Sequence, residues 1–118
     1  MPLQQRQIVE VPFNLTQGVK VHPAIILSTN EAIEFEYSFI AVMMTSVNHD
    51  DEYTFEISNE MLSSGKLGKP YSEVRLHLIS YFRVSDVIVN NHRHTFVKEA
   101  DFNRIVKRIM RITFNVYP

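Results

Sequence analysis

The chain has 118 residues, 45% of them hydrophobic and 21% charged, which is the composition of one globular domain and not of a disordered chain. Its net charge of −1 argues against a globally basic protein that coats nucleic acid, although a local basic patch remains compatible with it. Without cysteine the chain can form no disulfide, thiolate zinc site or cysteine nucleophile, which fits a reducing compartment. We therefore expect a single domain over residues 1–118.

The apolar runs are short. The longest, residues 39–44, falls far below the ~20 residues that a helix needs to span a bilayer. Residues 1–7 are polar and lack the apolar core of a signal peptide. We expect a cytoplasmic protein without a membrane partner.

Alternation of apolar and polar residues predicts a mainly β fold. The expected strands are Ile8–Phe13, Lys20–Ser28, Phe35–Thr45, Tyr53–Ile57, Ser72–Tyr81 and Asn90–Phe96. In the third of these, Phe35, Tyr37, Phe39, Ala41 and Met43 share one face, and the other face becomes apolar toward its end. That pattern is typical of a central strand that is covered on both sides.

A single long helix closes the chain. Its apolar positions have helical spacing over residues 98–113, and residues 58–62 favour one additional helical turn. The positions expected to face the core are Phe102, Ile105, Val106, Ile109 and Thr113. Several short strands and one helix predict a small, strongly bent sheet or partial barrel with the helix packed against it.

Three polar residues alternate along the strand Ser72–Tyr81. Glu73, Arg75 and His77 should point outward together, while Val74 and Leu76 point inward. Neighbours in such a row lie ~7 Å apart, a suitable spacing for groups that act on one phosphate. The alternative is a solvated strand face with a weak ion pair between Glu73 and Arg75.

Two further polar groups lie at strand ends. Thr45 and Ser46 carry hydroxyls at the end of the most hydrophobic strand, and the alternative to a functional role is that they only satisfy backbone groups of the loop. Lys20 and His22 share one face of the second strand, where a histidine beside a proline is usually structural. In the closing helix, the basic stripe Arg104, Lys107, Arg108 and Arg111 is either a solvated face or a contact for RNA or an acidic partner.

A pair of histidines is a candidate metal site. His92 and His94 would share a strand face, but the sequence offers no obvious third ligand and no cysteine. We expect no metal and no small-molecule cofactor.

Four segments, in order, resemble the PemK/MazF family of toxin ribonucleases over about residues 8–113. The family's opening strand G-D-I-V-x-V-x-F corresponds to R-Q-I-V-E-V-P-F at residues 6–13, and its R-P-A segment to H-P-A at residues 22–24. The family's P-I-T-S strand end corresponds to M-M-T-S at residues 43–46. Its G-L-x-K-P-S-x-V-R-x-D-Q segment corresponds to residues 65–78, and the amphipathic helix also matches.

The chain departs from these motifs at functional positions. The family's glycine and aspartate before the first strand are Arg6 and Gln7. The arginine of R-P is His22, the aspartate of R-x-D is His77, and the glutamine that follows is Leu78. Three positions match, namely Arg75, Thr45 and Ser46.

The resemblance implies an SH3-like partial barrel, a homodimer, cleavage of single-stranded RNA at selected sequences, and neutralisation by a cognate antitoxin. Metal-free cleavage needs a base for the 2′-hydroxyl, a cation for the transition state and an acid for the leaving 5′-oxygen. The hypothesis assigns catalysis to Arg75, His77, His22 and Thr45, with His22 and His77 as an acid–base pair around the phosphate-binding arginine. Ser46, Lys20, Thr16, Gln17 and Glu73 are candidate RNA contacts.

Two other interpretations stay open. If the two histidines are losses and not replacements, the chain is an inactive homologue that binds RNA or an antitoxin without cutting. The third possibility is an unrelated small β-barrel that makes only protein contacts. Tyr53, Phe55 and Tyr81 are candidates for stacking on RNA bases, although Tyr53 and Phe55 share a face with Ile57 and are expected in the core.

Overall fold

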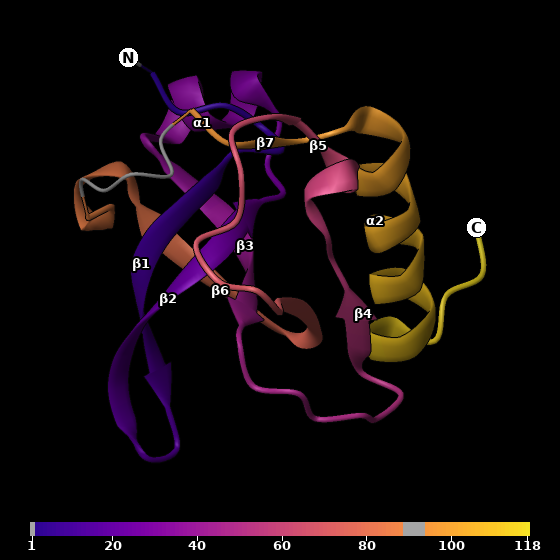
Figure 1. Ribbon diagram of the computed structural model, residues 1–118. Helices are drawn as coiled ribbons and strands as arrows, with labels where there is room; N and C mark the ends of the chain where they lie inside the picture. Colours follow the sequence, from indigo (N-terminus) through magenta and orange to yellow (C-terminus); the bar gives the residue numbers. More distant parts are fainter. Residues whose placement is uncertain (1, 89–93) are drawn as a thin grey trace.

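The fold is a bent antiparallel sheet of five strands with a long helix on one side (Figure 1). The computed structural model describes residues 2–88 and 94–118. Across the sheet the strands are β1 (Ile8–Leu15), β2 (Gly18–Ile26), β3 (Ser38–Thr45), β6 (Glu73–Arg83) and β4 (Thr54–Glu56). The short strands β5 (Leu62–Ser64) and β7 (Phe96–Val97) pair separately. The helices are α1 (Asn30–Glu36) and α2 (Glu99–Phe114), with 3₁₀ turns at η1 (Asn59–Met61) and η2 (Val84–Asp86).

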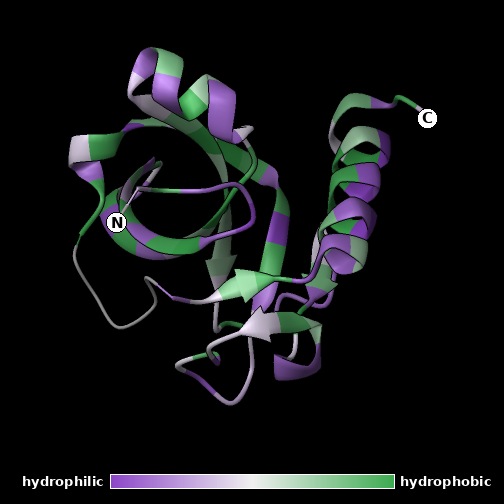
Figure 2. Ribbon diagram, turned by 90° about the horizontal axis from the view of Figure 1, so that it is seen from above, coloured by the Kyte–Doolittle hydropathy of each residue, from purple (hydrophilic) through white to green (hydrophobic). Residues whose placement is uncertain are grey.

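Two hydrophobic clusters lie on opposite faces of the sheet. Val42 and Met44 of β3 belong to the cluster that α2 covers with Phe102, Ile105 and Ile109. The alternate residues of β3, among them Phe39 and Met43, pack into the second cluster with α1. Figure 2 shows the strands curling round on one side of the molecule and α2 on the other. The prediction of a central strand covered on both sides is therefore confirmed, as is the partial barrel, whose sheet keeps β1 and β4 as its edges.

The helix α2 follows the prediction closely. Its apolar face buries Phe102, Ile105 and Ile109, while Val106 packs half-buried against the same cluster. Acidic Glu99 and Asp101 stand in its first turn and Arg111 in its last, which suits the helix dipole. The expected helical turn near residue 60 is also present as η1.

The predicted start of the third strand is wrong. Residues 30–36 form α1 instead, because the Thr29 hydroxyl caps the helix by accepting from the Ala32 amide at 3.2 Å. Tyr37 ends this helix in the left-handed region at φ 53°. Phe35 and Tyr37, expected on the core face, are 83% and 75% exposed. Their alternation with Phe39 is a coincidence of spacing across a helix end.

Strand β6 corrects a second expectation. Val42 of β3 pairs with Ile79, but Met44 pairs with Val74, so three additional residues of β6 bulge between the two pairs. Alternation breaks at this bend: Val74 and Ile79 pack on the α2 side, and Leu78 packs against the other cluster. Glu73 and Arg75, predicted to face solvent, are buried at 0% and 6% exposure, while His77 is exposed.

The predicted strand Asn90–Phe96 is seen only at its end. Phe96 begins β7, which continues to Val97, and residues 89–93 lie outside the described part of the chain. His92 of the histidine pair considered as a metal site belongs to that segment. Within residues 2–88 and 94–118, no helix is long and apolar enough to cross a membrane.

Candidate active site

A pocket of about 580 Å³ opens between the β1–β2 hairpin, the end of β3 and the loop that precedes β6. Four of the predicted site residues line it, namely Lys20, His22, Thr45 and Ser46. The loop adds Lys69, which the sequence interpretation did not select. The lining thus brings together two ammonium groups, one imidazole, three hydroxyls that include Ser72, and the carboxylate of Glu10. The cations and hydroxyls of this set suit a phosphate ester.

The strand register explains why His22 and Thr45 meet. Ala24 of β2 pairs with Met43 of β3 in an antiparallel ladder. Continued by two residues in each strand, this register brings His22 toward Thr45, where the ladder ends and the pocket begins. Lys20 lies two residues further along β2, on the same face as His22.

The His22 ring is partly shielded and biased toward its neutral form. It meets the buried Phe13 ring edge-on, with 6.2 Å between ring centroids. Burial lowers the pKa of His22 below 6.5, and the charge of Lys20 lowers it further against an opposing effect of the Met44 backbone. At neutral pH the imidazole is therefore an available base.

Thr45 has a structural role besides facing the pocket. Its side chain is buried, and its Oγ1 accepts a hydrogen bond from the Val47 amide at 3.2 Å. The alternative reading of this hydroxyl, as a partner for loop backbone, is thus confirmed. Its O–H proton can still be donated into the pocket, and exposed Ser46 stands beside it.

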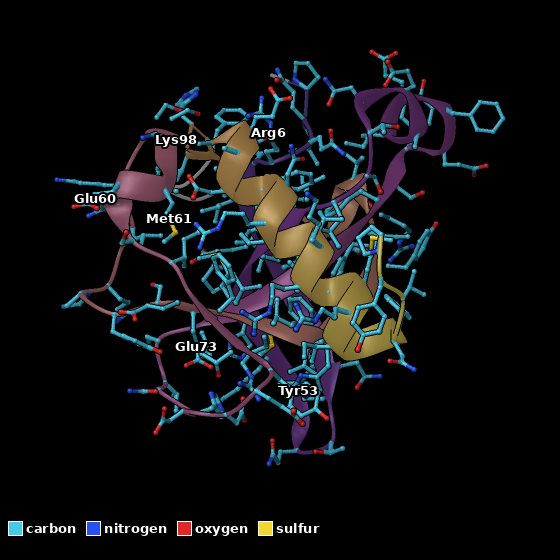
Figure 3. The ribbon with its side chains drawn as sticks, turned by 90° about the vertical axis from the view of Figure 1, so that its right-hand side faces the viewer. Arg6, Tyr53, Glu60, Met61, Glu73 and Lys98 are labelled. Carbon is cyan, nitrogen blue, oxygen red and sulfur yellow. The ribbon has the colours of Figure 1, made fainter. Side chains whose placement is uncertain are left out.

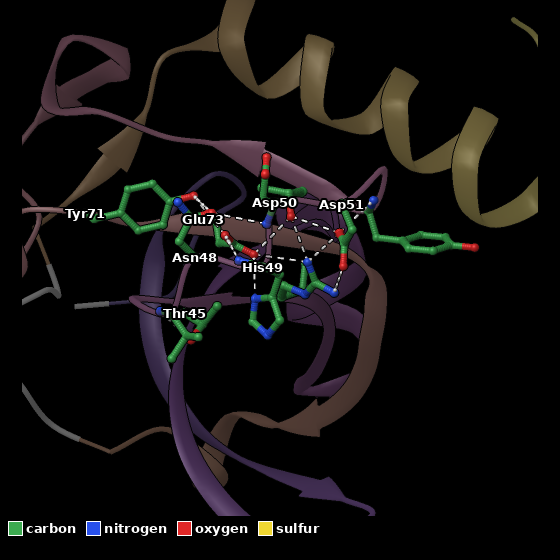
Figure 4. A network of polar contacts seen from close by, with 11 residues as sticks. Thr45, Asn48, His49, Asp50, Asp51, Tyr71 and Glu73 are labelled. Atoms are coloured by element: carbon green, nitrogen blue, oxygen red, sulfur yellow. Dashed lines mark hydrogen bonds and ion pairs between the residues drawn. The ribbon is translucent and has the colours of Figure 1, made fainter.

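Arg75 lies next to the pocket in a network of charged groups (Figure 4). Its Nη1 and Nη2 donate to Oδ1 and Oδ2 of Asp51 at 2.9 and 3.1 Å, a two-point ion pair. Nη1 also lies 3.0 Å from Glu73 Oε2 and 2.8 Å from Thr54 Oγ1. Hydrogen bonding with Asp51 raises the pKa of Arg75, and the same contact lowers the pKa of Asp51.

Glu73 is the centre of this network. Besides Arg75, its carboxylate accepts from the His49 amide at 3.1 Å, from His49 Nδ1 at 2.8 Å, from the Tyr71 hydroxyl at 2.8 Å and from Thr54 Oγ1 at 3.1 Å. Burial raises the pKa of Glu73, but these donors together outweigh burial and hold it below its ordinary value. Burial and the Glu73 charge raise the pKa of Tyr71 to about 12. The predicted RNA contact at Glu73 is therefore a buried anchor for the loop between β3 and β4.

His77 lies on the Arg75 side of the site and does not line the pocket. Its ring packs against Tyr53 with 4.6 Å between centroids. Burial and the Arg75 charge lower the pKa of His77, opposed by Asp51. Tyr53, expected in the core with Phe55, is only half-buried, whereas Phe55 is in the core as predicted.

The other predicted contacts lie further out. Thr16 and Gln17 form the exposed turn between β1 and β2 and do not line the pocket. Figure 3 places Glu73 and Tyr53 at the end of the molecule opposite Lys98, which precedes α2. Among the residues that the structure describes, no group of three or more histidine and carboxylate side chains is arranged to hold a metal ion.

The motifs around the pocket match those of a known protein family. The family model described as PemK-like, MazF-like toxin of type II toxin–antitoxin system matches residues 4–113. The chain belongs to this family. No curated protein matches it at a significant level.

Solved structures of PemK/MazF-family toxins share this fold at low identity. MazF from Deinococcus radiodurans gives a TM-score of 0.71 at 13% identity, covering 98% of this chain and 99% of that chain. An endoribonuclease in complex with its cognate antitoxin, from a mycobacterial species, gives 0.69 at 15% identity, covering 99% and 100%. The Mycobacterium tuberculosis toxin MazF-mt6 gives 0.64 at 13% identity, covering 94% and 98%.

Sequence reasoning missed several residues of the site in this PemK/MazF-family chain, and only some of them carry a signal in the sequence. Lys69 belongs to the K-P pair of the family segment at residues 65–78, so the sequence carried a signal for it. Asp51 and His49 sit in a polar loop with no pattern to distinguish them from Asp50 or Glu52. Only the folded loop brings Asp51 to Arg75, 24 residues away in the sequence.

Proposed function

We propose that the protein is a metal-independent endoribonuclease that cleaves single-stranded RNA by attack of the 2′-hydroxyl on the adjacent phosphate. The observation that carries this proposal is the pocket that His22, Thr45 and Ser46 line together with Lys20 and Lys69. Two cations and two hydroxyl donors can hold one phosphodiester, and a neutral imidazole can take its 2′-proton. No metal is needed for any of these roles.

The reaction follows from these groups. His22 accepts the proton of the 2′-hydroxyl as the O2′–P bond forms, while lysine ammonium groups offset the charge that builds on the phosphorane. Thr45 and Ser46 donate hydrogen bonds to the phosphate oxygens. The P–O5′ bond then breaks, and the leaving oxygen takes its proton from the protonated His77 imidazole. His77 lies outside the pocket lining on the Arg75 side, so this step requires the RNA to extend from the pocket to that side. The products are a 2′,3′-cyclic phosphate and a free 5′-hydroxyl.

The substrate class is RNA read at selected sequences, in the cytoplasm. The exposed His77 ring, packed on half-buried Tyr53, offers a surface on which a base can stack, and Thr16 and Gln17 lie in the exposed hairpin turn as candidate base contacts. Family membership also supports a cognate antitoxin as a partner, since a structural neighbour is an endoribonuclease with its antitoxin.

We further expect a homodimer. Ile40 and Tyr81 are cross-strand partners at 46% and 64% exposure, so the sheet presents apolar side chains to solvent. Light scattering should give twice the chain mass of 13.8 kDa. A monomer at micromolar concentration would contradict this expectation.

The test is incubation of the purified protein with a long single-stranded RNA in EDTA. We expect cleavage at a few sites, with 2′,3′-cyclic phosphate ends on the upstream fragments. A second candidate function competes with this outcome, namely a catalytically inactive homologue that binds RNA or an antitoxin. The ion pairing of Arg75 with Asp51 and Glu73 favours it, because that guanidinium is already neutralised. Binding of the RNA without any cutting would support this second function and contradict the first.

A further inference from the structure

We infer that Asp51 is an internal competitor for the phosphate site of Arg75, and that an RNA phosphate binds this arginine by displacing the Asp51 carboxylate. The inference rests on the proposed function for the choice of RNA as ligand. In this inference Asp51 lowers the affinity for RNA, and Arg75 binds a second phosphate beside the pocket.

The geometry of the pair is that of a phosphate complex. Asp51 meets the two terminal nitrogens of Arg75 with its two oxygens, at 2.9 and 3.1 Å, side by side. Two oxygens of a phosphate take the same paired positions on a guanidinium. A nucleotide that binds Arg75 through this edge must therefore replace Asp51.

The two carboxylates on Arg75 differ in how firmly they are held. Glu73 is completely buried and receives hydrogen bonds from His49, Tyr71 and Thr54, so it remains with the arginine as part of the scaffold. The Asp51 side chain is 39% exposed and lies on the loop that connects β3 to β4. Asp51 is therefore the carboxylate that solvent can reach and a phosphate can replace, and because Arg75 itself is buried, the phosphate must restore the two-point contact that Asp51 gives up.

The surroundings of Arg75 fit a nucleotide. His77 lies close enough to Arg75 for the charge of the arginine to lower its pKa, and its exposed ring packs on Tyr53. On the other side, Thr45 of the pocket is the cross-strand partner of Glu73. An RNA strand running from the pocket over this row would meet Lys20 and His22 first and Arg75 next.

The acidic surface around Asp51 offers a rival explanation for any restraint on RNA binding. Asp50, Asp51 and Glu56 line a shallow hollow beside the arginine, and this acidic surface repels RNA. General repulsion and specific competition predict different changes in RNA affinity. Repulsion depends only on the charge of the surface, whereas competition requires both Asp51 and Arg75.

The experiment measures binding of a fluorescent single-stranded RNA whose 2′-oxygens are all methylated, so that it cannot be cleaved by 2′-attack. Anisotropy titrations at fixed ionic strength compare the wild type with Asp51→Asn, Asp50→Asn, Arg75→Gln and the double variant Asp51→Asn/Arg75→Gln. Asparagine keeps the Oδ1 that accepts from the Tyr53 amide and from Thr54, so the loop retains its local bonds. Asp50→Asn removes the same charge from the same loop, and asparagine tolerates its positive φ of 48°.

We expect Asp51→Asn to tighten binding by about fivefold or more, and to lose that gain in the Arg75→Gln background. Asp50→Asn should change Kd by less than about twofold, the size of a screened surface charge. Asp51→Ser, which keeps a short acceptor for the loop, should repeat the gain. Circular dichroism and a thermal melt establish that each variant is folded.

Three results would overturn the inference. Weaker binding by folded Asp51→Asn and Asp51→Ser would make Asp51 a positioning residue that prepares Arg75. An equal gain in Asp50→Asn, or a gain that persists without Arg75, would reduce the effect to general repulsion. The proposed function is tested separately by cleavage of unmodified RNA. Cleavage with no coupling between Asp51 and Arg75 removes only the inference, and coupling without cleavage removes only the nuclease.

Discussion

Thr45 and Glu73 stand directly opposite each other on β3 and β6. This one cross-strand pair joins the two polar regions of the molecule, since Thr45 lines the pocket and Glu73 anchors the network around Arg75. The same pair holds the first residues of the loop that begins at Ser46, through the Val47 amide on Thr45 and the His49 amide on Glu73. A substitution at Glu73 should therefore alter the structure of the pocket.

The first prediction concerns stability. Glu73→Gln removes the charge and turns one accepting oxygen into a donor, which then faces either Arg75 and His49 Nδ1 at the Oε2 position or Tyr71 and the His49 amide at the Oε1 position. Because Glu73 and Arg75 are shielded from water, we expect the free energy of unfolding to fall by about 2–4 kcal/mol. Urea denaturation followed by circular dichroism measures the change.

Glu56→Gln is the matched control for Glu73→Gln. Glu56 pairs with Glu73 across β4 and β6 but is exposed. We expect its loss to change the free energy of unfolding by less than about 0.5 kcal/mol. Equal destabilisation by the two variants would mean that the network contributes no more than a surface charge.

The second prediction concerns the catalytic base. His22→Gln retains a polar side chain but cannot exchange a proton near neutral pH, so we expect the cleavage rate to fall by about 10²- to 10⁴-fold with little change in RNA affinity. Single-turnover cleavage of an end-labelled RNA gives the rate, and binding of the methylated RNA gives the affinity. His94→Gln, at an exposed position away from the pocket lining, is the control and should cleave normally. A His22→Gln protein that cuts at the wild-type rate would exclude this base.

The third prediction is the pH dependence of cleavage. His22 must be neutral to accept a proton, so the rate rises with pH through a pKa that burial lowers below 6.5. His77 must be protonated to act as the acid, so the rate falls as pH passes its own pKa, which burial and Arg75 also lower. We expect a bell-shaped profile with its maximum below pH 6.5, and loss of the alkaline limb in His77→Gln. An alkaline limb that remains in this variant would assign the acid to another group, such as Lys20.

The fourth prediction concerns phosphate binding by the loop before β6. Lys69 lines the pocket, whereas Lys66 lies in the same loop outside it. Lys69→Gln should weaken RNA binding several-fold and reduce the slope of log K against log salt by about 0.7, the value for one phosphate of a single strand. Lys66→Gln loses the same charge and should leave that slope unchanged. Equal slopes in the two variants would place the RNA away from this loop.

Much of the fold was predictable because its signals are local. The apolar spacing of α2 and the two apolar faces of β3 come from periodicity, and both are present in the structure. Phe35 and Tyr37 misled the prediction because α1 ends just before β3 and leaves their spacing continuous with the strand. Periodicity alone cannot locate such a junction. The Thr29 cap was the available signal.

The site was predictable only in part, for a different reason. Lys20, His22, Thr45 and Ser46 meet in the pocket because adjacent strands carry them to one end of the sheet. The burial of Glu73 and Arg75 depends on the β3–β4 loop, which folds back over β6. The path of this loop leaves no periodic trace in the sequence.

The last prediction tests how the loop between β5 and β6, which contains Gly65 and Lys69, is held in place. Gly65 has φ 75°, and a Cβ at this position would lie 2.8 Å from the Cα of buried Thr95. Gly18 also has positive φ, at 117°, but nothing lies near its missing Cβ. The pair therefore separates backbone strain from steric contact.

We expect Gly18→Ala to lower the free energy of unfolding by about 1–2 kcal/mol through strain alone. Gly65→Ala should lower it by a further 1–3 kcal/mol, about the cost of overpacking, because Thr95 must move. Since residues 67–69 line the pocket and the turn at Gly18 does not, Gly65→Ala should also weaken RNA binding more than Gly18→Ala does. Urea denaturation and anisotropy of the methylated RNA measure the two effects. If Gly65→Ala proved no more harmful than Gly18→Ala in either measurement, close packing on Thr95 would not be what positions Lys69 for the phosphate.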